Sequence, residues 1–342
     1  LEGLGLALLA DGKPGKAADI LAKAVAGAPK RSTTRMALAR ALAESGRQEE
    51  SEKAIKEAFR LNPRKAAMAE AERAQRDGRM EDAEKALREI LANDPKNARA
   101  MRMLGSIALE ANRYGAARRL LEGAVKLSPG VAICWSDLAN LHLKKDRYDE
   151  ALESVSRAIE IDPQFAHAYV VKGNILTRAQ RMEEALEAYQ EALDVSPLNI
   201  GALNGKGHVL KTIGRQEEAI AAFRQCIRAN PAFGETYWSL ANLKTFEFDP
   251  EEVKTMEDMV EREGLADEPK VNMLVSLGKH YENEKDYGKA FECYRRGNDL
   301  RRQHEIYDPV HTQVVHDRIM GVFNEELFAE RQGYGDPSPD PI

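Results

Sequence analysis

The sequence predicts an all-α fold, a solenoid in which pairs of short helices repeat along the chain. Seven prolines recur at a separation of 34 residues, shortened once to 32, at Pro29, Pro63, Pro95, Pro129, Pro163, Pro197 and Pro231. One position between them always holds a small residue, at Ala17, Ser51, Ala83, Ala117, Ala151, Ala185 and Ala219. Hydrophobic residues make up 43% of the chain, which is enough to bury a continuous core.

The clearest unit runs from Ala132 to Phe165 and fixes the register of the others. Its diagnostic residues are Trp135, Leu138, Ala139 and His142, then Ala151 and Val155, then Ala158 and Pro163. This order resembles the tetratricopeptide repeat (TPR), with Ala at the usual Gly position and His at the usual Tyr position. The resemblance implies a right-handed TPR superhelix. Each proline is expected to end the second helix of its pair, because proline cannot continue the backbone ladder.

The period divides the chain into segments. Residues 1–248 hold seven repeats, the first truncated, and a partial eighth. The third repeat is two residues short, and we expect the deletion at or before its first helix. A non-TPR helical insert is predicted over 249–270, with Asp249 as N-cap, Pro250 as the first helical residue and Gly264 at its end. A final TPR-like helix pair without a closing proline is predicted over 271–304.

The C-terminal stretch reads as a cap followed by a linker. A helix is predicted within 305–332, with an apolar stripe made of Val315, Ile319, Val322 and Phe323. We expect it to cap the solenoid, because a terminal repeat otherwise leaves a hydrophobic face in water. Residues 333–342 alternate Gly and Pro with polar residues, as is typical of a linker. Because Leu1 lies inside a repeat, we interpret the chain as an excerpt of a longer protein.

Charge and cysteine content argue against several function classes. With 50 basic and 56 acidic residues and a net charge of −6, the chain has no general attraction to nucleic-acid phosphates or anionic lipid. Cys134, Cys226 and Cys293 are far apart and are predicted to be reduced and packed among helices, as in a cytoplasmic protein. No apolar run is long enough for a membrane span. His311 and His316 lack the i, i+4 spacing of helical metal ligands, so no metal is expected.

A candidate binding site lies on the first helices, whose exposed face lines the concave groove of TPR proteins. One register position holds polar residues that are 34 positions apart, at Asn140, Asn174, His208 and Asn242. An amide offers both a donor and an acceptor, so this ladder can hold the backbone of an extended peptide without reading its sequence. The alternative is that these residues are solvated polar groups on an exposed helix face.

Four residues before the ladder, the same helices hold Ser136, Val170, Asn204 and Trp238. In chaperone-binding TPR domains a lysine at this position grips a terminal carboxylate. We therefore expect no tight binding of chaperone C-terminal tails. Tyr237 is core by register, which leaves Trp238 as a candidate anchor for a partner. The alternative is that the insert after Asp249 buries Trp238.

The end of the chain carries a more specific resemblance. Tyr237 to Phe248 (YWSLANLKTFEF), Ser276 to Arg302 (SLGKHYENEKDYGKAFECYRRGNDLRR) and Tyr307 with Asp308 resemble TPR-containing sulfotransferases of bacteria. In that family such a segment joins the repeats to the catalytic domain, and the closing GYGDPSPDPI looks like the approach to its first strand. The resemblance implies that the parent protein uses the phosphosulfate cofactor PAPS, held beyond Ile342. No catalytic residue and no cofactor are expected within the chain itself.

We interpret the chain as a protein-interaction arm whose groove binds a polypeptide substrate or partner for an attached sulfotransferase. A free-standing scaffold and an arm for another transferase, such as a glycosyltransferase, are the alternatives, and the insert from Lys244 to Pro269 favours the first interpretation. The basic run Arg295, Arg296, Arg301 and Arg302 either faces an anionic group on a neighbouring domain or forms local ion pairs. The sequence does not determine the sulfate acceptor or the oligomeric state.

Overall fold

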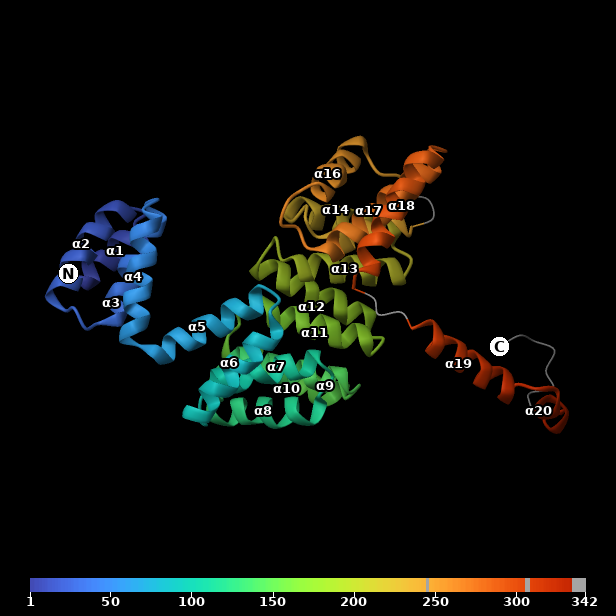
Figure 1. Cartoon of the computed structure of the whole chain (residues 1–342), viewed down its shortest axis with the longest axis horizontal. Helices are drawn as coiled ribbons and strands as arrows, with labels where there is room; N and C mark the ends of the chain where they lie inside the picture. The colour runs from blue at the N-terminus through green and yellow to red at the C-terminus, as the bar shows by residue number, and fades with distance from the viewer. Residues whose placement is uncertain (244–245, 305–307, 334–342) are drawn as a thin grey trace. The chain divides into compact units, whose positions relative to one another are not determined.

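The structure is a computed structural model that describes residues 1–243, 246–304 and 308–333, and every regular element in these ranges is helical (Figure 1). The helices form two compact units, 1–219 and 220–342, with the boundary inside α14 (Gln216–Ala229). Lys244, Tyr307 and all of the predicted linker after Gly333 lie outside the described residues. Within the described ranges, no helix combines the length and the apolar character that crossing a membrane requires.

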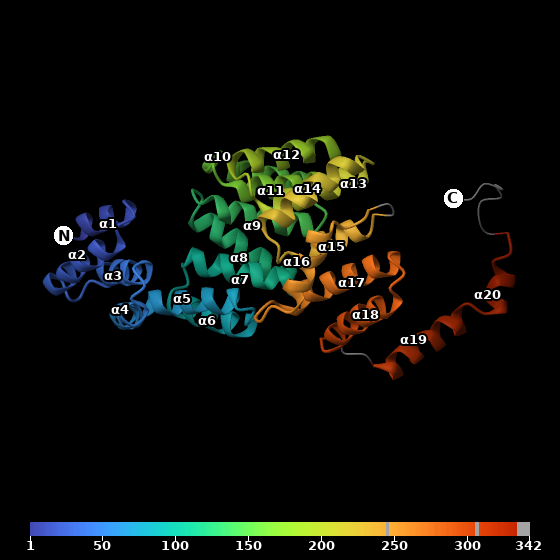
Figure 2. The same ribbon diagram turned by 90° about the horizontal axis from the view of Figure 1, so that it is seen from above.

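Unit 1 consists of successive helix pairs, which Figure 2 shows following one another in chain order. They are α1 (Glu2–Ala10) with α2 (Pro14–Gly27), α3 (Ser32–Glu44) with α4 (Gln48–Leu61), α5 (Pro63–Arg76) with α6 (Met80–Asn93), α7 (Ala98–Glu110) with α8 (Tyr114–Leu127), α9 (Ala132–Lys144) with α10 (Tyr148–Ile161), and α11 (Ala166–Arg178) with α12 (Met182–Val195), followed by α13 (Ile200–Thr212). The predicted all-α repeat fold is confirmed.

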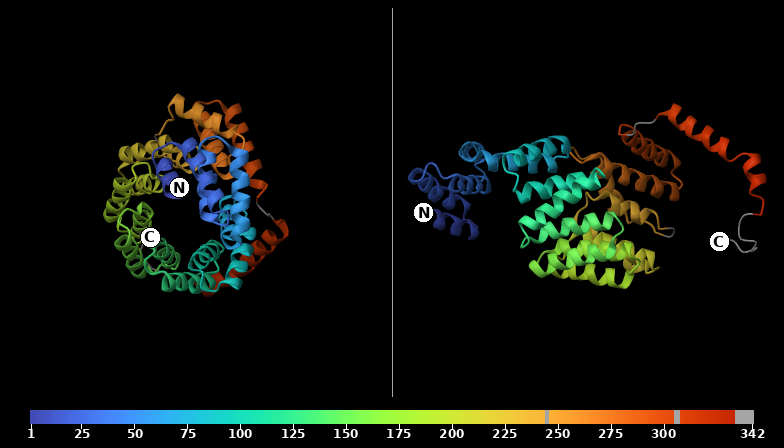
Figure 3. Two further views of the ribbon diagram at one scale, coloured as in Figure 1. Left: turned by 90° about the vertical axis from the view of Figure 1, so that its left-hand side faces the viewer. Right: turned by 90° about the horizontal axis from the view of Figure 1, so that it is seen from below.

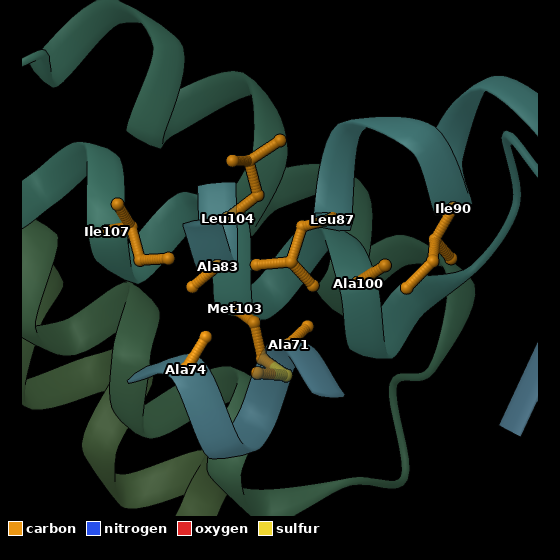
Figure 4. Packing of buried hydrophobic residues seen from close by; sticks show 9 residues of the cluster. All are labelled: Ala71, Ala74, Ala83, Leu87, Ile90, Ala100, Met103, Leu104 and Ile107. Atoms are coloured by element: carbon orange, nitrogen blue, oxygen red, sulfur yellow. The ribbon is translucent and has the colours of Figure 1, made fainter. Parts of the chain in front are cut away.

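The small residue of each second helix is buried, as its spacing predicted. Ala83, Ala117, Ala151 and Ala185 have no exposed surface. Ser51 is the polar member of the series, and its hydroxyl donates to the carbonyl oxygen of Ala39 at 2.8 Å, which satisfies the buried group. Figure 4 shows one such core, in which side chains of α5, α6 and α7 meet, namely Ala71, Ala74, Ala83, Leu87, Ile90, Ala100, Met103, Leu104 and Ile107.

The third repeat departs from the prediction at Pro63. Six of the recurring prolines lie in turns after a second helix, but Pro63 is the first residue of α5. The two-residue deletion leaves Asn62 alone between α4 and α5, and its side chain accepts a hydrogen bond from the Lys65 N–H at 3.1 Å. Proline fits the first helical position because the N–H it lacks has no intrahelical partner there. The deletion therefore lies at the start of the first helix, as expected.

Unit 2 continues with α15 (Gly234–Ala241), α16 (Pro250–Val260), α17 (Asp267–Asn283), α18 (Tyr287–Arg302), α19 (Pro309–Val322) and α20 (Glu325–Glu330). Helix α15 packs beside α17, and α17 pairs with α18 (Figure 3). The two helices approach closely at Gly234, because a Cβ built on it would lie 2.4 Å from the carbonyl oxygen of Pro269. The eighth first helix thus packs directly against the first helix of the last pair.

The insert contains one helix, α16, which begins at Pro250 as predicted. The carboxylate of Glu252 accepts a hydrogen bond from the Asp249 N–H at 2.9 Å, which caps this end. The helix ends at Val260 rather than at the predicted Gly264, which adopts a positive φ of 77° in the following turn. Val253, Met256 and Val260 form its buried face.

Arg224 of α14 connects this helix to the N-terminal end of α16. Its guanidinium donates to Glu252 and to Asp249, each at 2.8 Å, and lies 5.4 Å from the centre of the Phe246 ring. The Glu252 side chain is only 13% exposed, and the ion pair with Arg224 offsets the cost of removing its carboxylate from water. The repeat register does not reveal this cluster, because its members lie up to 28 positions apart on different elements.

Replacing Arg224 by Ala should destabilise unit 2 by about 1–2 kcal/mol, because hydrogen bonds to charged groups contribute at this level and solvent screens part of the pair. Urea unfolding would measure the change. Arg228→Ala on the exposed side of the same helix is the matched control and should leave the midpoint within error. Equal midpoints for the two variants would show that the cluster contributes nothing.

The predicted C-terminal helix is two helices. Helix α19 ends at Val322, Phe323 is its C-cap, and Asn324 starts α20 by accepting a hydrogen bond from the Leu327 N–H at 2.9 Å. The Asp308 carboxylate accepts from the N–H groups of Val310 and His311, as an N-cap does. Neither helix buries a residue, so the predicted apolar stripe is exposed and the capping role stays a prediction.

Candidate peptide-binding face

The structure places three ladder residues on successive first helices of unit 1. Asn140 lies on α9, Asn174 on α11 and His208 on α13, and each side chain reaches solvent at least in part. The side chain of Asn140 makes no hydrogen bond within the described residues. Its amide is therefore available to a partner, with both a donor and an acceptor.

One of the two polar groups of the Asn174 side chain is already hydrogen-bonded within the protein. The hydroxyl of Tyr189 on α12 donates to its Oδ1 at 2.7 Å, which leaves the Nδ2 group to donate. The Tyr189 ring is buried between two glycines, because Cβ atoms built on Gly173 and Gly205 would lie 2.6 Å and 2.5 Å from ring atoms. Tyr189 thus spans from the second-helix core to the first-helix face and orients the amide.

The fourth ladder residue has a different role. Asn242 lies in unit 2 as the C-cap of α15, and its Nδ2 donates to the carbonyl oxygen of Trp238 at 2.8 Å. A side-chain amide that donates to a carbonyl oxygen at the end of its own helix has fewer hydrogen-bonding groups left for a ligand. The ladder of free amides predicted from the 34-residue spacing therefore does not extend to Asn242.

The four positions that precede the ladder are not equivalent. Ser136 is fully buried and Val170 is nearly so, so neither can contact a ligand in a groove. Asn204 is half-buried and has a partner within the chain. Trp238 is 43% exposed beside the fully buried Tyr237, as the register predicted. The alternative, in which the insert buries Trp238, is wrong.

An ion pair that was not predicted from the sequence lies on the first helices of unit 1. Arg102 of α7 donates to Asp137 of α9 at 2.8 Å, and the Ser106 hydroxyl donates to the same carboxylate oxygen at 3.1 Å. Both charged side chains are mostly buried, at 19% and 15% exposed. Arg102 occupies the register of Ser136 one repeat earlier, and Ser106 that of Asn140. Comparing the same two register positions in the preceding repeat would have identified Arg102 and Ser106.

The ion pair between Arg102 and Asp137 limits what the Arg102 side chain can bind. Arg102 supplies a cation where a carboxylate clamp has lysine, but Asp137 already occupies its guanidinium. A second pair, between Arg99 of α7 and Glu72 of α5, follows on the preceding helices. Arg99 and Arg102 thus each have a carboxylate partner within the protein.

Burial shifts the pKa values of two histidines and one cysteine near this face. It lowers the pKa of His167 below its usual value, and the charge of Asp137 opposes the shift. Burial also lowers the pKa of His142, whose Nδ1 is buried and has no hydrogen-bond partner among the residues that the structure describes. The pKa of the buried Cys134 thiol is raised, again by desolvation. None of the three cysteines forms a disulfide within the described part of the chain. A thiol of raised pKa is rarely ionised and so is a weak nucleophile, and Cys134 packs as a small apolar residue.

The basic run of α18 forms local ion pairs. Arg295 donates to Glu292 at 2.6 Å and to Asp299 at 2.8 Å, and Arg296 donates to Glu261 of α16 at 2.7 Å. These contacts support the second of the two interpretations, in which the run is a solvated face.

Comparison with known families identifies repeats along most of the chain. Models of the tetratricopeptide repeat match residues 8–75, 68–132, 136–200, 200–233 and 271–304. An uncharacterized protein of Aquifex aeolicus (strain VF5) is 28% identical over 92 residues, which are 27% of this chain and 12% of that relative. The chain thus spans a small part of the relative's length.

Helical-repeat proteins of known structure align with this chain, and one of them does so with a TM-score above 0.5. The Cut9–Hcn1 hetero-tetramer of the APC/C aligns with a TM-score of 0.55 at 14% identity, over 66% of this chain and 45% of that chain. TTC0263, a TPR protein of Thermus thermophilus, aligns with a TM-score of 0.48 at 15% identity, over 51% and 94% of the two chains. MamA 41-end of Desulfovibrio magneticus RS-1 aligns with 0.41 at 20% identity, over 50% and 97%. At these identities only the helical-repeat fold is shared.

Proposed function

Because the chain belongs to the tetratricopeptide repeat family, we propose that the first-helix face of unit 1 binds an extended segment of a partner protein. One observation carries the proposal. Asn140 has an uncommitted amide, and Asn174, one repeat later, keeps a free donor held in place by Tyr189. Two amides at this spacing can pair with the main chain of an extended peptide, which gives affinity with little sequence selectivity.

The test compares peptide capture by matched variants of the intact chain. A phage-displayed library of linear peptides is selected on the wild type, and the enriched peptides are synthesised and measured by calorimetry. Asn140→Ala with Asn174→Ala should weaken these peptides about tenfold or more, since each lost hydrogen bond contributes about 1 kcal/mol. Asn93→Ala, at an exposed amide on the second helix α6, is the control. Unchanged affinity in the double variant would reject this face as the site.

On the resemblance of its last hundred or so residues, we propose further that the arm serves a PAPS-dependent sulfotransferase domain encoded beyond Ile342 in a cytoplasmic bacterial protein. The segments from Tyr237 to Phe248 and from Ser276 to Arg302 carry this proposal. The reading frame of the parent gene tests it directly. A short apolar strand, a phosphate-binding loop and a helix should follow, and the longer protein should bind phosphosulfate. A stop codon would instead favour the free-standing scaffold.

A further inference from the structure

A cation lies one helical turn after a ladder residue on three successive first helices of unit 1. The pairs are Asn140 with Lys144 on α9, Asn174 with Arg178 on α11, and His208 with Lys211 on α13. Side chains three or four positions apart share one face of a helix, so each cation lies beside the ladder residue of its own helix. The first-helix face therefore carries positive charge next to the amides that are proposed to hold a peptide backbone.

Two of these cations have no partner within the described part of the chain. The side chains of Lys144 and Lys211 form no ion pair and no hydrogen bond there. Arg178 differs, because it donates to Asp146 at 2.9 Å and its charge is offset by that carboxylate. Lys144 is exposed and Lys211 is partly exposed, so both ammonium groups can meet a carboxylate that arrives from solvent.

The helix dipole does not account for this distribution of charge. A cation is favoured near the C-terminal end of any helix, yet α10 and α12, second helices of the same repeats, have no basic residue in their last turn. One repeat earlier, α7 ends with Glu110 at the register position of Lys144. Positive charge at these helix ends thus coincides with the ladder on α9, α11 and α13.

The spacing of the two unpaired lysines sets the length of peptide between them. Helix α11 contacts both α9 and α13 and lies between them (Figure 1). Packed helices are about 8–10 Å apart and an extended chain advances about 3.3 Å per residue, so one repeat corresponds to about three residues of peptide. An extended segment that passes from Lys144 to Lys211 therefore spans about six residues.

We propose that the segment bound by this face is acidic and carries two Asp or Glu side chains about six residues apart, which pair with Lys144 and Lys211. The inference rests on the proposed function, since the amides of Asn140 and Asn174 hold the backbone of the same segment. The carboxylates come from side chains rather than from a chain terminus, because Ser136 is fully buried at the position where a terminal-carboxylate clamp has lysine.

Selection from a phage-displayed library of random linear peptides on the intact chain tests the charge of the partner. Peptides enriched by the wild type should contain Asp and Glu at least about twofold more often than the input library. Lys144→Glu with Lys211→Glu should abolish this preference or reverse it toward Lys and Arg. The matched control is Lys85→Glu with Lys126→Glu, which adds the same charge at two exposed lysines of the second helices α6 and α8 and should leave the preference unchanged.

Calorimetry on one enriched peptide measures the size of the effect. The peptide is synthesised with an amidated C-terminus, once with its acidic residues and once with each replaced by the corresponding amide. The acidic form should bind the wild type about fivefold more tightly, which corresponds to about 1 kcal/mol for two exposed ion pairs. The amide form should bind Lys144→Glu with Lys211→Glu as tightly as it binds the wild type, which shows that the face is still folded.

The outcomes separate this inference from the proposed function. Wild-type peptides without acidic enrichment overturn the inference, and if Asn140→Ala with Asn174→Ala still weakens them, the proposed function stands. Unchanged affinity in that asparagine variant rejects the proposed function and the inference with it. An acidic preference that persists in Lys144→Glu with Lys211→Glu, or binding that requires a free C-terminal carboxylate, overturns the inference alone.

Discussion

Gly234→Ala should lower the stability of unit 2 by about 3 kcal/mol, at the upper end of the cost of overpacking a core. The added methyl group would meet the backbone of Pro269, with the carbonyl oxygen at 2.4 Å and the Cα at 2.7 Å. A backbone cannot rotate away as a side chain can, so α15 and α17 must separate. The gain in helix propensity from Gly to Ala is at most about 1 kcal/mol and does not offset this.

Denaturant unfolding followed by tryptophan fluorescence measures the loss. The chain has two tryptophans, Trp135 in unit 1 and Trp238 in unit 2, so a Trp135→Phe background reports on unit 2 alone. Gly288→Ala is the control, because it lies in the first turn of α18, where an added Cβ would meet no atom closer than 3.8 Å. If Gly234→Ala unfolded at the same midpoint as Gly288→Ala, the direct contact of α15 with α17 would be wrong.

Gly205→Ala should destabilise unit 1 by about 2–3 kcal/mol, for a related reason. The new Cβ would lie within 2.8 Å of three Tyr189 atoms, and Gly173 confines the same ring on its other side. The ring is fully packed, so relief requires a shift of α13 or loss of the hydrogen bond to Asn174. Unfolding followed through Trp135 in a Trp238→Phe background would measure the change.

A second substitution should restore stability to Gly205→Ala. Tyr189→Leu removes every Tyr189 atom that the new methyl would meet, and leucine holds the same register at Leu87 and Leu121. The coupling between the two substitutions should be about 1 kcal/mol or more. Gly115→Ala on α8, with no atom near its added Cβ, is the control and should be neutral or slightly stabilising. Strict additivity of Gly205→Ala and Tyr189→Leu would contradict the contact.

Much of the candidate site could be anticipated from the repeat register. The 34-residue spacing correctly separated the buried Tyr237 from the exposed Trp238, and it placed Asn140 and Asn174 on first helices with their side chains at least partly in solvent. It did not reveal that Tyr189 reaches Asn174, because the direction of a side chain depends on the glycines that let the ring pass. Asn242 differs for a local reason, since α15 stops at Ala241 and converts the next residue into a cap.

The sequence by itself determined which segments form helices, where the pairs begin and which small residues they bury. These features depend on residues that are close together in the chain and on the 34-residue repeat, and both are visible in the sequence. The tertiary structure decided which polar groups are already paired, as with Arg102 and Asp137, and which backbones touch, as with Gly234 and Pro269. Such partners come from separate helices, so their contact depends on the three-dimensional approach of those helices, which no local pattern specifies.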